Sequence, residues 1–294
     1  MREKLLISFS GGRTSAYMTQ WLLRNRQQQF DMIVVFANTG KEREETLNFI
    51  DQCDKYFGFR VHWIEAVTNL ERGAGVSARL VDFQTASRKG EPFEAFIQKH
   101  GIPNVEAPKC SRELKAAAIR AYARSIGWTK YYTAIGIRAD EPDRVDMKTA
   151  RKERVIYPLA HMIRANKSDI NLFWSKQPFD LALKSYEINC DLCWKKSLRK
   201  LMTIVKDNPA LADWWQEMEN KYGTYLPPAS RNNNNIRLPV RFYRDYMSIG
   251  DIVAESKFNH APAVDESKII DPHKQPDVFD EEHGSCAESC EPYG

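Results

Sequence analysis

The stretch that decides the fold is Lys4-Leu5-Leu6-Ile7-Ser8-Phe9-Ser10-Gly11-Gly12-Arg13-Thr14-Ser15. It begins as a short apolar run, which predicts a buried strand over 4–9, and apolar residues then recur at helical spacing over 15–26. Glycines between a strand and a helix let the backbone turn tightly and aim its N–H groups at an anion. The helix dipole and the hydroxyls of Ser10, Thr14 and Ser15 add to that attraction. The stretch therefore predicts a phosphate-binding loop, and an ordinary glycine-rich turn with a serine cap is the alternative.

The same alternation of strand and helix continues along the chain. Strands are predicted over 32–37, 60–64 and 130–137, and helices over 42–57, 92–100 and 112–126. Strands separated by helices of this length predict an α/β fold with a doubly wound parallel sheet. Residues 73–90 show no clear period and are expected to form a mobile loop.

The chain divides into three expected regions. Residues 1–165 hold the α/β nucleotide-binding domain, and residues 166–264 form a mainly helical extension that contains a C-x-x-C motif. Residues 265–294 lack periodicity, and 265–291 carry nine acids against two lysines. This composition predicts a flexible acidic tail.

Composition limits the class of protein. The 294 residues are 43% hydrophobic and 28% charged, as in a globular protein that buries a core. The net charge is only +4, but 109–154 holds twelve Lys/Arg against six Asp/Glu, which suits phosphate, nucleic acid or simply a solvated helix face. No signal peptide or membrane-spanning run is found, so a cytoplasmic protein without membrane attachment is expected. In that reducing compartment, the six cysteines are expected to bind metal or act in catalysis.

Three motifs carry a resemblance to a known family. Ser10-Gly11-Gly12-x-x-Ser15 resembles the PP-loop of ATP pyrophosphatases and phosphoadenosine phosphosulfate (PAPS) reductases. Ala37-Asn38-Thr39-Gly40 with Glu45-Thr46 is similar to the Asp-Thr-Gly and Glu-Thr segments of PAPS reductases. Gly136-Ile137-Arg138-Ala139-Asp140-Glu141-Pro142-Asp143-Arg144 resembles their Gly-x-Arg-x-x-Glu-Ser-x-x-Arg segment. The resemblance covers about residues 4–200 and implies the PP-loop (HUP) type of fold.

The resemblance implies a site for an adenine nucleotide, either ATP or PAPS. Ligands of parallel sheets bind beyond the carboxyl ends of the strands, where all three motifs are expected. Arg138 and Arg144 suit oxyanions because guanidinium donates two parallel hydrogen bonds, although a surface ion-pair loop with Asp140 and Glu141 is the alternative. The implied nucleotide-binding residues are Ser8, Ser10, Gly11, Gly12, Arg13, Thr14, Ser15, Asn38, Thr39, Gly40, Gly136, Arg138 and Arg144. Arg13 stands where Lys or Asp is usual, and Asn38 and Pro142 replace the usual Asp and Ser.

Three cysteines suggest a metal centre. Cys190 and Cys193 form the C-x-x-C motif, whose turn can direct two sulfurs toward one metal. Cluster-bearing relatives place a single upstream cysteine against such a motif, so the resemblance implies a 4Fe–4S cluster held by Cys110, Cys190 and Cys193. Zinc and free buried thiols are the alternatives. Cys53 is expected in the core.

Two further cysteines lie near the end of the chain, Cys286 and Cys290. Similar PAPS reductases use one tail cysteine to attack the sulfur of the bound sulfonucleotide, giving a thiosulfonate that thioredoxin or another thiol reductant resolves. The resemblance thus implies Cys286, Cys290 and Arg138 as catalytic residues. A fourth cluster ligand or an idle surface thiol are the other readings of the tail cysteines.

Three functions follow from these features. The first is a PAPS reductase-like enzyme that reduces a sulfonucleotide to sulfite. The second is an ATP pyrophosphatase, dependent on Mg²⁺, that adenylates a substrate for sulfur insertion into nucleic acid, as in DNA phosphorothioation. The basic stretch 194–200, which is expected to be a helix, and Trp214-Trp215 favour this function. The third is a non-enzymatic, metal-stapled nucleic-acid-binding module. A homodimer is also among the expected assemblies.

Overall fold

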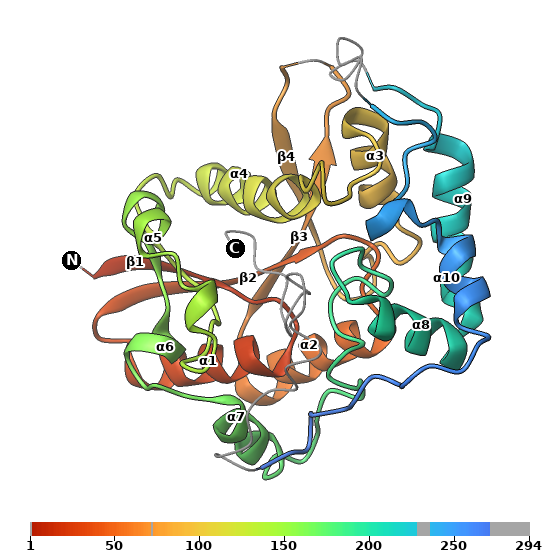
Figure 1. Cartoon of the computed structure of the whole chain (residues 1–294). Helices are drawn as coiled ribbons and strands as arrows, with labels where there is room; N and C mark the ends of the chain where they lie inside the picture. The colour runs from red at the N-terminus through yellow and green to blue at the C-terminus, as the bar shows by residue number, and fades with distance from the viewer. Residues whose placement is uncertain (1, 72, 228–235, 271–294) are drawn as a thin grey trace.

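The fold is a six-stranded sheet covered by helices on both faces (Figure 1). It is seen in a computed structural model that describes residues 2–71, 73–227 and 236–270. The strand order is β4-β3-β2-β1-β5-β6, and all neighbouring strands are parallel except β3 and β4. The doubly wound sheet is confirmed. The strands are β1 (Glu3–Ser8), β2 (Phe30–Asn38), β3 (Val61–Thr68), β4 (Val76–Val81), β5 (Tyr132–Ala134) and β6 (Val155–Ile156).

The helices form two layers around the sheet. In Figure 1, α1, α2, α6 and α7 lie below the sheet, and α3 and α4 lie above it. A π-helical segment, Ser111–Ala117, leads directly into α4. The helices are α1 (Arg13–Asn25), α2 (Glu44–Phe57), α3 (Glu91–His100), α4 (Ala118–Ser125), α5 (Met147–Glu153), α6 (Pro158–His161), α7 (Lys167–Trp174), α8 (Leu198–Asp207), α9 (Ala212–Tyr222) and α10 (Ile249–Glu255).

The alternation of side chains along β1 explains the two layers. Leu5 and Ile7 belong to the apolar cluster on the α1 side, whereas Leu6 belongs to the cluster on the α4 side. Both clusters continue beyond residue 165, because Trp174 packs into the first and Trp215 into the second. The helices α8, α9 and α10 are therefore fastened to the sheet domain through its own core.

One element differs from the prediction. Residues 73–90 were expected to be a loop, but Val76–Val81 form the edge strand β4, antiparallel to β3. The sequence Val-Ser-Ala-Arg-Leu alternates apolar and polar side chains, as strands do, but the prediction did not use this short signal. As an edge strand, β4 is only partly buried. The following turn is ordered by Asp82, which accepts hydrogen bonds from Gln84 and Thr85.

The search for membrane-spanning elements was negative. In the described part of the chain, no helix has the length and apolarity needed to cross a bilayer. Cys286, Cys290 and the expected tail beyond Ile270 lie outside the described residues.

Candidate active site

The loop between β1 and α1 has the backbone geometry of an anion site. Gly11 adopts φ +83°, a conformation that side chains other than glycine rarely reach. A Cβ on Gly11 would lie 2.7 Å from Cγ2 of Thr46 in α2, so glycine is also needed for packing. Gly12 is the N-cap of α1 and provides no side-chain cap, which leaves the first N–H groups of the helix for another acceptor.

Hydroxyl groups surround this loop. Ser15 Oγ accepts a hydrogen bond from the Ser10 backbone N at 3.2 Å and lies 2.9 Å from Ser10 Oγ, which fixes the shape of the loop. Thr14 Oγ1 and Thr46 Oγ1 are buried and have no hydrogen-bond partner among the described residues. Buried polar groups without partners are rare in native proteins and indicate a missing ligand or water. Thr46 is a candidate binding residue that the motif analysis quoted but did not assign to the site.

The loop after β5 closes the other side of this site. A Cβ on Gly136 would lie 3.2 Å from Cα of Ser15, so glycine allows the two backbones to meet. β1 is the strand from which the chain moves outward to β2 in one direction and to β5 in the other. The carboxyl ends of β1 and β5 are thus the topological switch point, where open α/β sheets bind their ligands.

The two arginines of this loop are held by acids. Arg138 is 5% exposed, and its Nε donates to Asp140 Oδ1 at 2.9 Å. Glu141 accepts from the Arg138 backbone N at 3.1 Å and pairs with Arg144. The ion-pair cluster considered in the sequence analysis is therefore present, but it is partly buried at a strand end and orients Arg138 inside the protein.

The side chain of Arg13 is committed elsewhere in the fold. It is buried, and its guanidinium forms a two-bond ion pair with Asp180 at 2.6 and 3.0 Å. It also donates to the backbone carbonyls of Leu181 and Leu183, while Trp174 Nε1 donates to the Arg13 carbonyl at 3.0 Å. Arg13 thus ties the start of α1 to the segment 180–183, and what it can offer a phosphate is its backbone N–H.

The loop after β2 is built around a buried carboxylate. Asn38 Nδ2 donates to Glu65 Oε1 at 2.6 Å and to the Ser87 carbonyl at 2.9 Å, and Asn38 and Glu65 are both 0% exposed. Arg79 and Ser87 complete the hydrogen bonds to Glu65. An amide at position 38 is required here because a carboxylate could not donate to Glu65. Sequence motifs gave no indication of Glu65.

The next residues connect this loop to the cysteines. Thr39 donates to Glu42 through its backbone N at 2.9 Å and through its hydroxyl, and Thr39 Oγ1 lies 3.5 Å from Cys190 Sγ. Lys41 Nζ forms a buried ion pair with Asp191 Oδ2 at 3.0 Å. Gly40 has φ +79° and packs its α-carbon against Gly90. The end of β2 and the C-x-x-C motif are therefore one packed unit.

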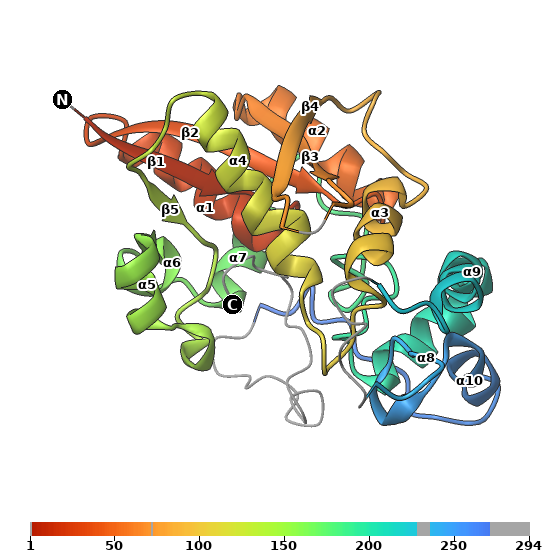
Figure 2. The same cartoon turned by 90° about the horizontal axis from the view of Figure 1, so that it is seen from above.

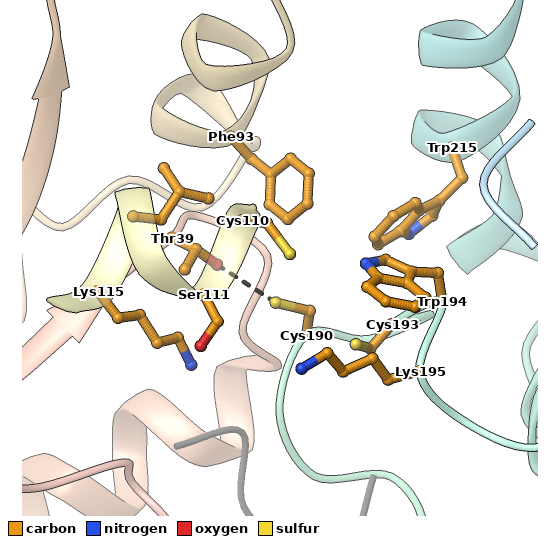
Figure 3. A pocket seen from close by; sticks show the side chains of 11 residues that line it. Thr39, Phe93, Cys110, Ser111, Lys115, Cys190, Cys193, Trp194, Lys195 and Trp215 are labelled. Carbon is orange, nitrogen blue, oxygen red and sulfur yellow. Dashed lines mark hydrogen bonds between the residues drawn. The ribbon is translucent and has the colours of Figure 1, made fainter. Parts of the chain in front are cut away.

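The three cysteines predicted to bind metal line one small cavity of about 20 Å³. Figure 3 shows Cys110, Cys190 and Cys193 with their side chains around this space. Cys110 is the N-cap residue of the π-helical segment Ser111–Ala117. Turns of π-helix are frequent at functional sites. The remaining lining residues are Thr39, Phe93, Ser111, Leu114, Lys115, Trp194, Lys195 and Trp215.

The surroundings of Cys190 favour its neutral thiol. Burial raises the pKa of the Cys190 thiol well above its usual value, and the charge of Glu42 raises this pKa further, while Lys115 lowers it. The described residues include no set of three His, Cys, Asp or Glu side chains placed to hold a single metal ion. A cluster distributes its ligands over several irons, and three buried thiols around one cavity are a donor set of the kind that such a cluster uses.

The basic stretch 194–200 differs from its prediction. The helix begins only at Leu198, and Trp194 and Lys196 are each 4% exposed. Lys196 Nζ donates to the carbonyls of Tyr186 and Ile188 inside the protein. Trp215 is fully buried, whereas Trp214, Arg199 and Lys200 are partly exposed. Cys53 is fully buried in the core, as expected.

Comparison with known proteins identifies the family. The chain belongs to the phosphoadenosine phosphosulfate reductase domain family, whose sequence model matches residues 4–254. The match extends well beyond residue 200, where the motifs ended. It supports nucleotide binding as the common property of the fold.

Individual relatives are more distant. The chain is 31% identical over 293 residues to the uncharacterized nin region protein ORF290 of Escherichia phage lambda, covering 98% of this chain and 95% of that protein. It is 22% identical to an uncharacterized protein of Methanocaldococcus jannaschii, over 76% of this chain and 42% of that protein. Among solved structures, PAPS reductase from Candida auris in a phosphate complex aligns with a TM-score of 0.38 and 12% identity, over 58% of this chain and 71% of that one.

Proposed function

We propose that this protein is an enzyme of sulfur chemistry that binds an adenine nucleotide, and that it reduces a sulfonucleotide to sulfite. The observation that supports this best is the packing of the phosphate loop and the cysteine cavity at one edge of the sheet. The contact between Thr39 Oγ1 and Cys190 Sγ, at 3.5 Å, joins the loop after β2 to that cavity. Family membership supports the nucleotide, and the cysteines support the chemistry.

The residues of the loop would hold the phosphoryl or sulfuryl oxygens. The N–H groups at the start of α1 and the unpartnered hydroxyls of Thr14 and Thr46 are donors without acceptors of their own. Arg138 and Arg144, oriented by Glu141, would add positive charge from the β5 side. The remaining residues of the proposed site are Ser8, Ser10, Gly11, Gly12, Arg13, Ser15, Asn38, Thr39, Gly40 and Gly136.

The proposed reaction uses a cysteine thiolate as nucleophile. The thiolate of Cys286 or Cys290 attacks the sulfur of the sulfonate, the nucleotide phosphate leaves, and a thiosulfonate forms. A thiol reductant such as thioredoxin then attacks this intermediate, so that sulfite is released and a disulfide takes up the oxidation. Arg138 would stabilise the negative charge on the leaving phosphate.

One observation favours a second reaction, the ATP-dependent transfer of sulfur to a substrate such as nucleic acid. Three cysteines around one cavity match the cluster-bearing relatives better than a reductase that needs only its tail cysteine. In this reaction ATP with Mg²⁺ would occupy the same loop and release pyrophosphate on adenylating the acceptor. A 4Fe–4S cluster held by Cys110, Cys190 and Cys193 would supply a site for inorganic sulfur.

Two measurements distinguish these reactions. Calorimetry should show binding of PAPS, ATP or both, and failure of both to bind at millimolar concentration would remove the nucleotide site from the proposal. PAPS with reduced thioredoxin should release sulfite under the first proposal, and ATP with Mg²⁺ should release pyrophosphate under the second. Replacing Cys286 and Cys290 by Ser should abolish sulfite release without weakening nucleotide binding.

A third measurement tests the metal centre. Anaerobic purification with iron and sulfide analysis decides between cluster, zinc and free thiols. Cys110→Ser should lose the bound metal, whereas Cys53→Ser, a matched change in the core, should retain it. Equal metal content in both variants would exclude Cys110 as a ligand.

A further inference from the structure

The cavity of the three cysteines contains a buried donor to which the described residues offer no acceptor. Trp194 is 4% exposed, and its indole Nε1 is buried without a hydrogen-bond partner among the described residues. In Figure 3, the nitrogen of Trp194 is on the side of the ring that faces the sulfurs of Cys110 and Cys190. An indole N–H can only donate, so an acceptor is required inside the cavity.

The neighbouring Trp215 shows that the unpaired indole N–H is specific to Trp194 and is not shared by both tryptophans at the cavity. Trp215 lines the same cavity, but its Nε1 donates to Asp191 Oδ1 at 2.8 Å. Two indoles from different segments thus meet at one cavity wall, and only one of them has its acceptor within the described protein. Leaving a donor buried and unpaired is costly, so the unpaired one indicates an occupant.

The chemistry of the wall indicates what kind of occupant this is. The Thr39 hydroxyl donates to Glu42 and accepts from Lys41 N. Besides the hydroxyls of Thr39 and Ser111, the lining side chains offer sulfur as acceptor. Ser111, Lys115 and Lys195 line the same space, and two of these three side chains are cationic. Donors, cations and thiols around a dry cavity suit an anion that contains sulfur.

We propose that the Trp194 indole N–H is a binding group for an anionic sulfur species in this cavity, either hydrosulfide or the sulfide of an iron–sulfur cluster. The proposal rests on the proposed sulfur chemistry at the three cysteines. It adds a residue that positions the sulfur and does not depend on which nucleotide binds at the phosphate loop.

The proposal has a different consequence for each source of sulfide. A hydrogen bond to free hydrosulfide slows its loss from the cavity. A hydrogen bond to a cluster sulfide stabilises the reduced, more negative cluster and raises its reduction potential. A tenfold change in the relative stability of the reduced form corresponds to about 59 mV for a one-electron couple.

The experiment uses the full chain under anaerobic conditions in two arms. One arm receives sodium sulfide alone, and the other receives ferrous iron with sulfide. Trp194→Phe removes the N–H and keeps an aromatic ring, Trp194→His restores a ring N–H, and Trp128→Phe is the matched control in a buried position away from the cavity. Retained acid-labile sulfide per chain and, in the iron arm, the midpoint potential are measured on variants whose circular dichroism matches that of the wild type.

The expected result is retention of sulfide by the wild type and by Trp128→Phe in one arm. Trp194→Phe should then lose sulfide about tenfold faster, or show a potential lower by about 59 mV, with partial recovery in Trp194→His. Equal behaviour of Trp194→Phe and the wild type would overturn the role of Trp194 and leave the proposed sulfur site standing. Failure of the wild type to hold sulfide in either arm would overturn both, whereas nucleotide binding would still be judged by calorimetry.

Discussion

Replacing Asn38 by Asp tests whether the buried hydrogen bonds after β2 dictate the departure from the family motif. Asn38 Nδ2 donates a hydrogen bond of 2.6 Å to Glu65 Oε1 and one of 2.9 Å to the Ser87 carbonyl. The side chains of Asn38 and Glu65 are not exposed to solvent. Asp would lose both donors and bring two carboxylates into contact. The loss of a charge-assisted hydrogen bond and an uncompensated buried charge together predict a decrease of about 3–5 kcal/mol in the free energy of unfolding near neutral pH.

The pH dependence of this variant has a definite sign. Two carboxylates in contact favour sharing a proton, which the unfolded chain releases above about pH 4. The defect should therefore be largest at neutral pH, shrink as the pH falls toward about 4, and change no further below that pH, where both states are protonated. Urea unfolding of the wild type and the variant at several pH values measures it.

A compensating change separates this reasoning from general damage. In Asn38→Asp with Glu65→Gln, the new amide can donate to the Asp carboxylate, so at least half of the lost stability should return. Asn69→Asp, an exposed side chain that only accepts a hydrogen bond from Glu71 N, is the matched control and should stay within about 0.5 kcal/mol of the wild type. If Asn38→Asp were equally mild, or if the double variant were no better than the single one, the account of this loop would be refuted.

Three further changes test other parts of the structure. Gly11→Ala should weaken ATP or PAPS binding at least about tenfold in calorimetry, because φ +83° and the 2.7 Å approach to Thr46 leave no room for a methyl group; unchanged affinity would contradict the assignment of the loop. Arg13→Ala should lower the free energy of unfolding by about 2–3 kcal/mol in urea, less than for a fully buried pair because the Asp180 side chain is 37% exposed; a neutral effect would show that this tie is unimportant. Burial lowers the pKa values of His62 and His100. The free energy of unfolding should therefore be highest above about pH 6.5 and should decline as the pH falls through the lowered values. A urea midpoint that stays constant from pH 7.5 to 5.5 would argue against this.

The sheet and the glycine turn between β1 and α1 could be predicted because their signals are local. A short apolar run, a glycine pair and a helical period follow one another directly in the sequence. β4 was missed although Val-Ser-Ala-Arg-Leu alternates apolar and polar side chains, because the signal covers only five residues of an otherwise irregular stretch. The stretch 194–200 was predicted as a basic helix because its charges are visible in the sequence. That Lys196 donates to carbonyl groups inside the protein is not visible there.

The sequence by itself determined the class of fold, the family and the glycine turn between β1 and α1, because strand period, glycine placement and motif spacing are properties of neighbouring residues. Only the tertiary structure decided which side chains contact one another. It paired Arg13 with Asp180 across 167 positions, placed Glu65 under Asn38, and gathered Cys110, Cys190 and Trp194 around one cavity. Such contacts depend on burial and on distances between segments far apart in the chain, which no local pattern records.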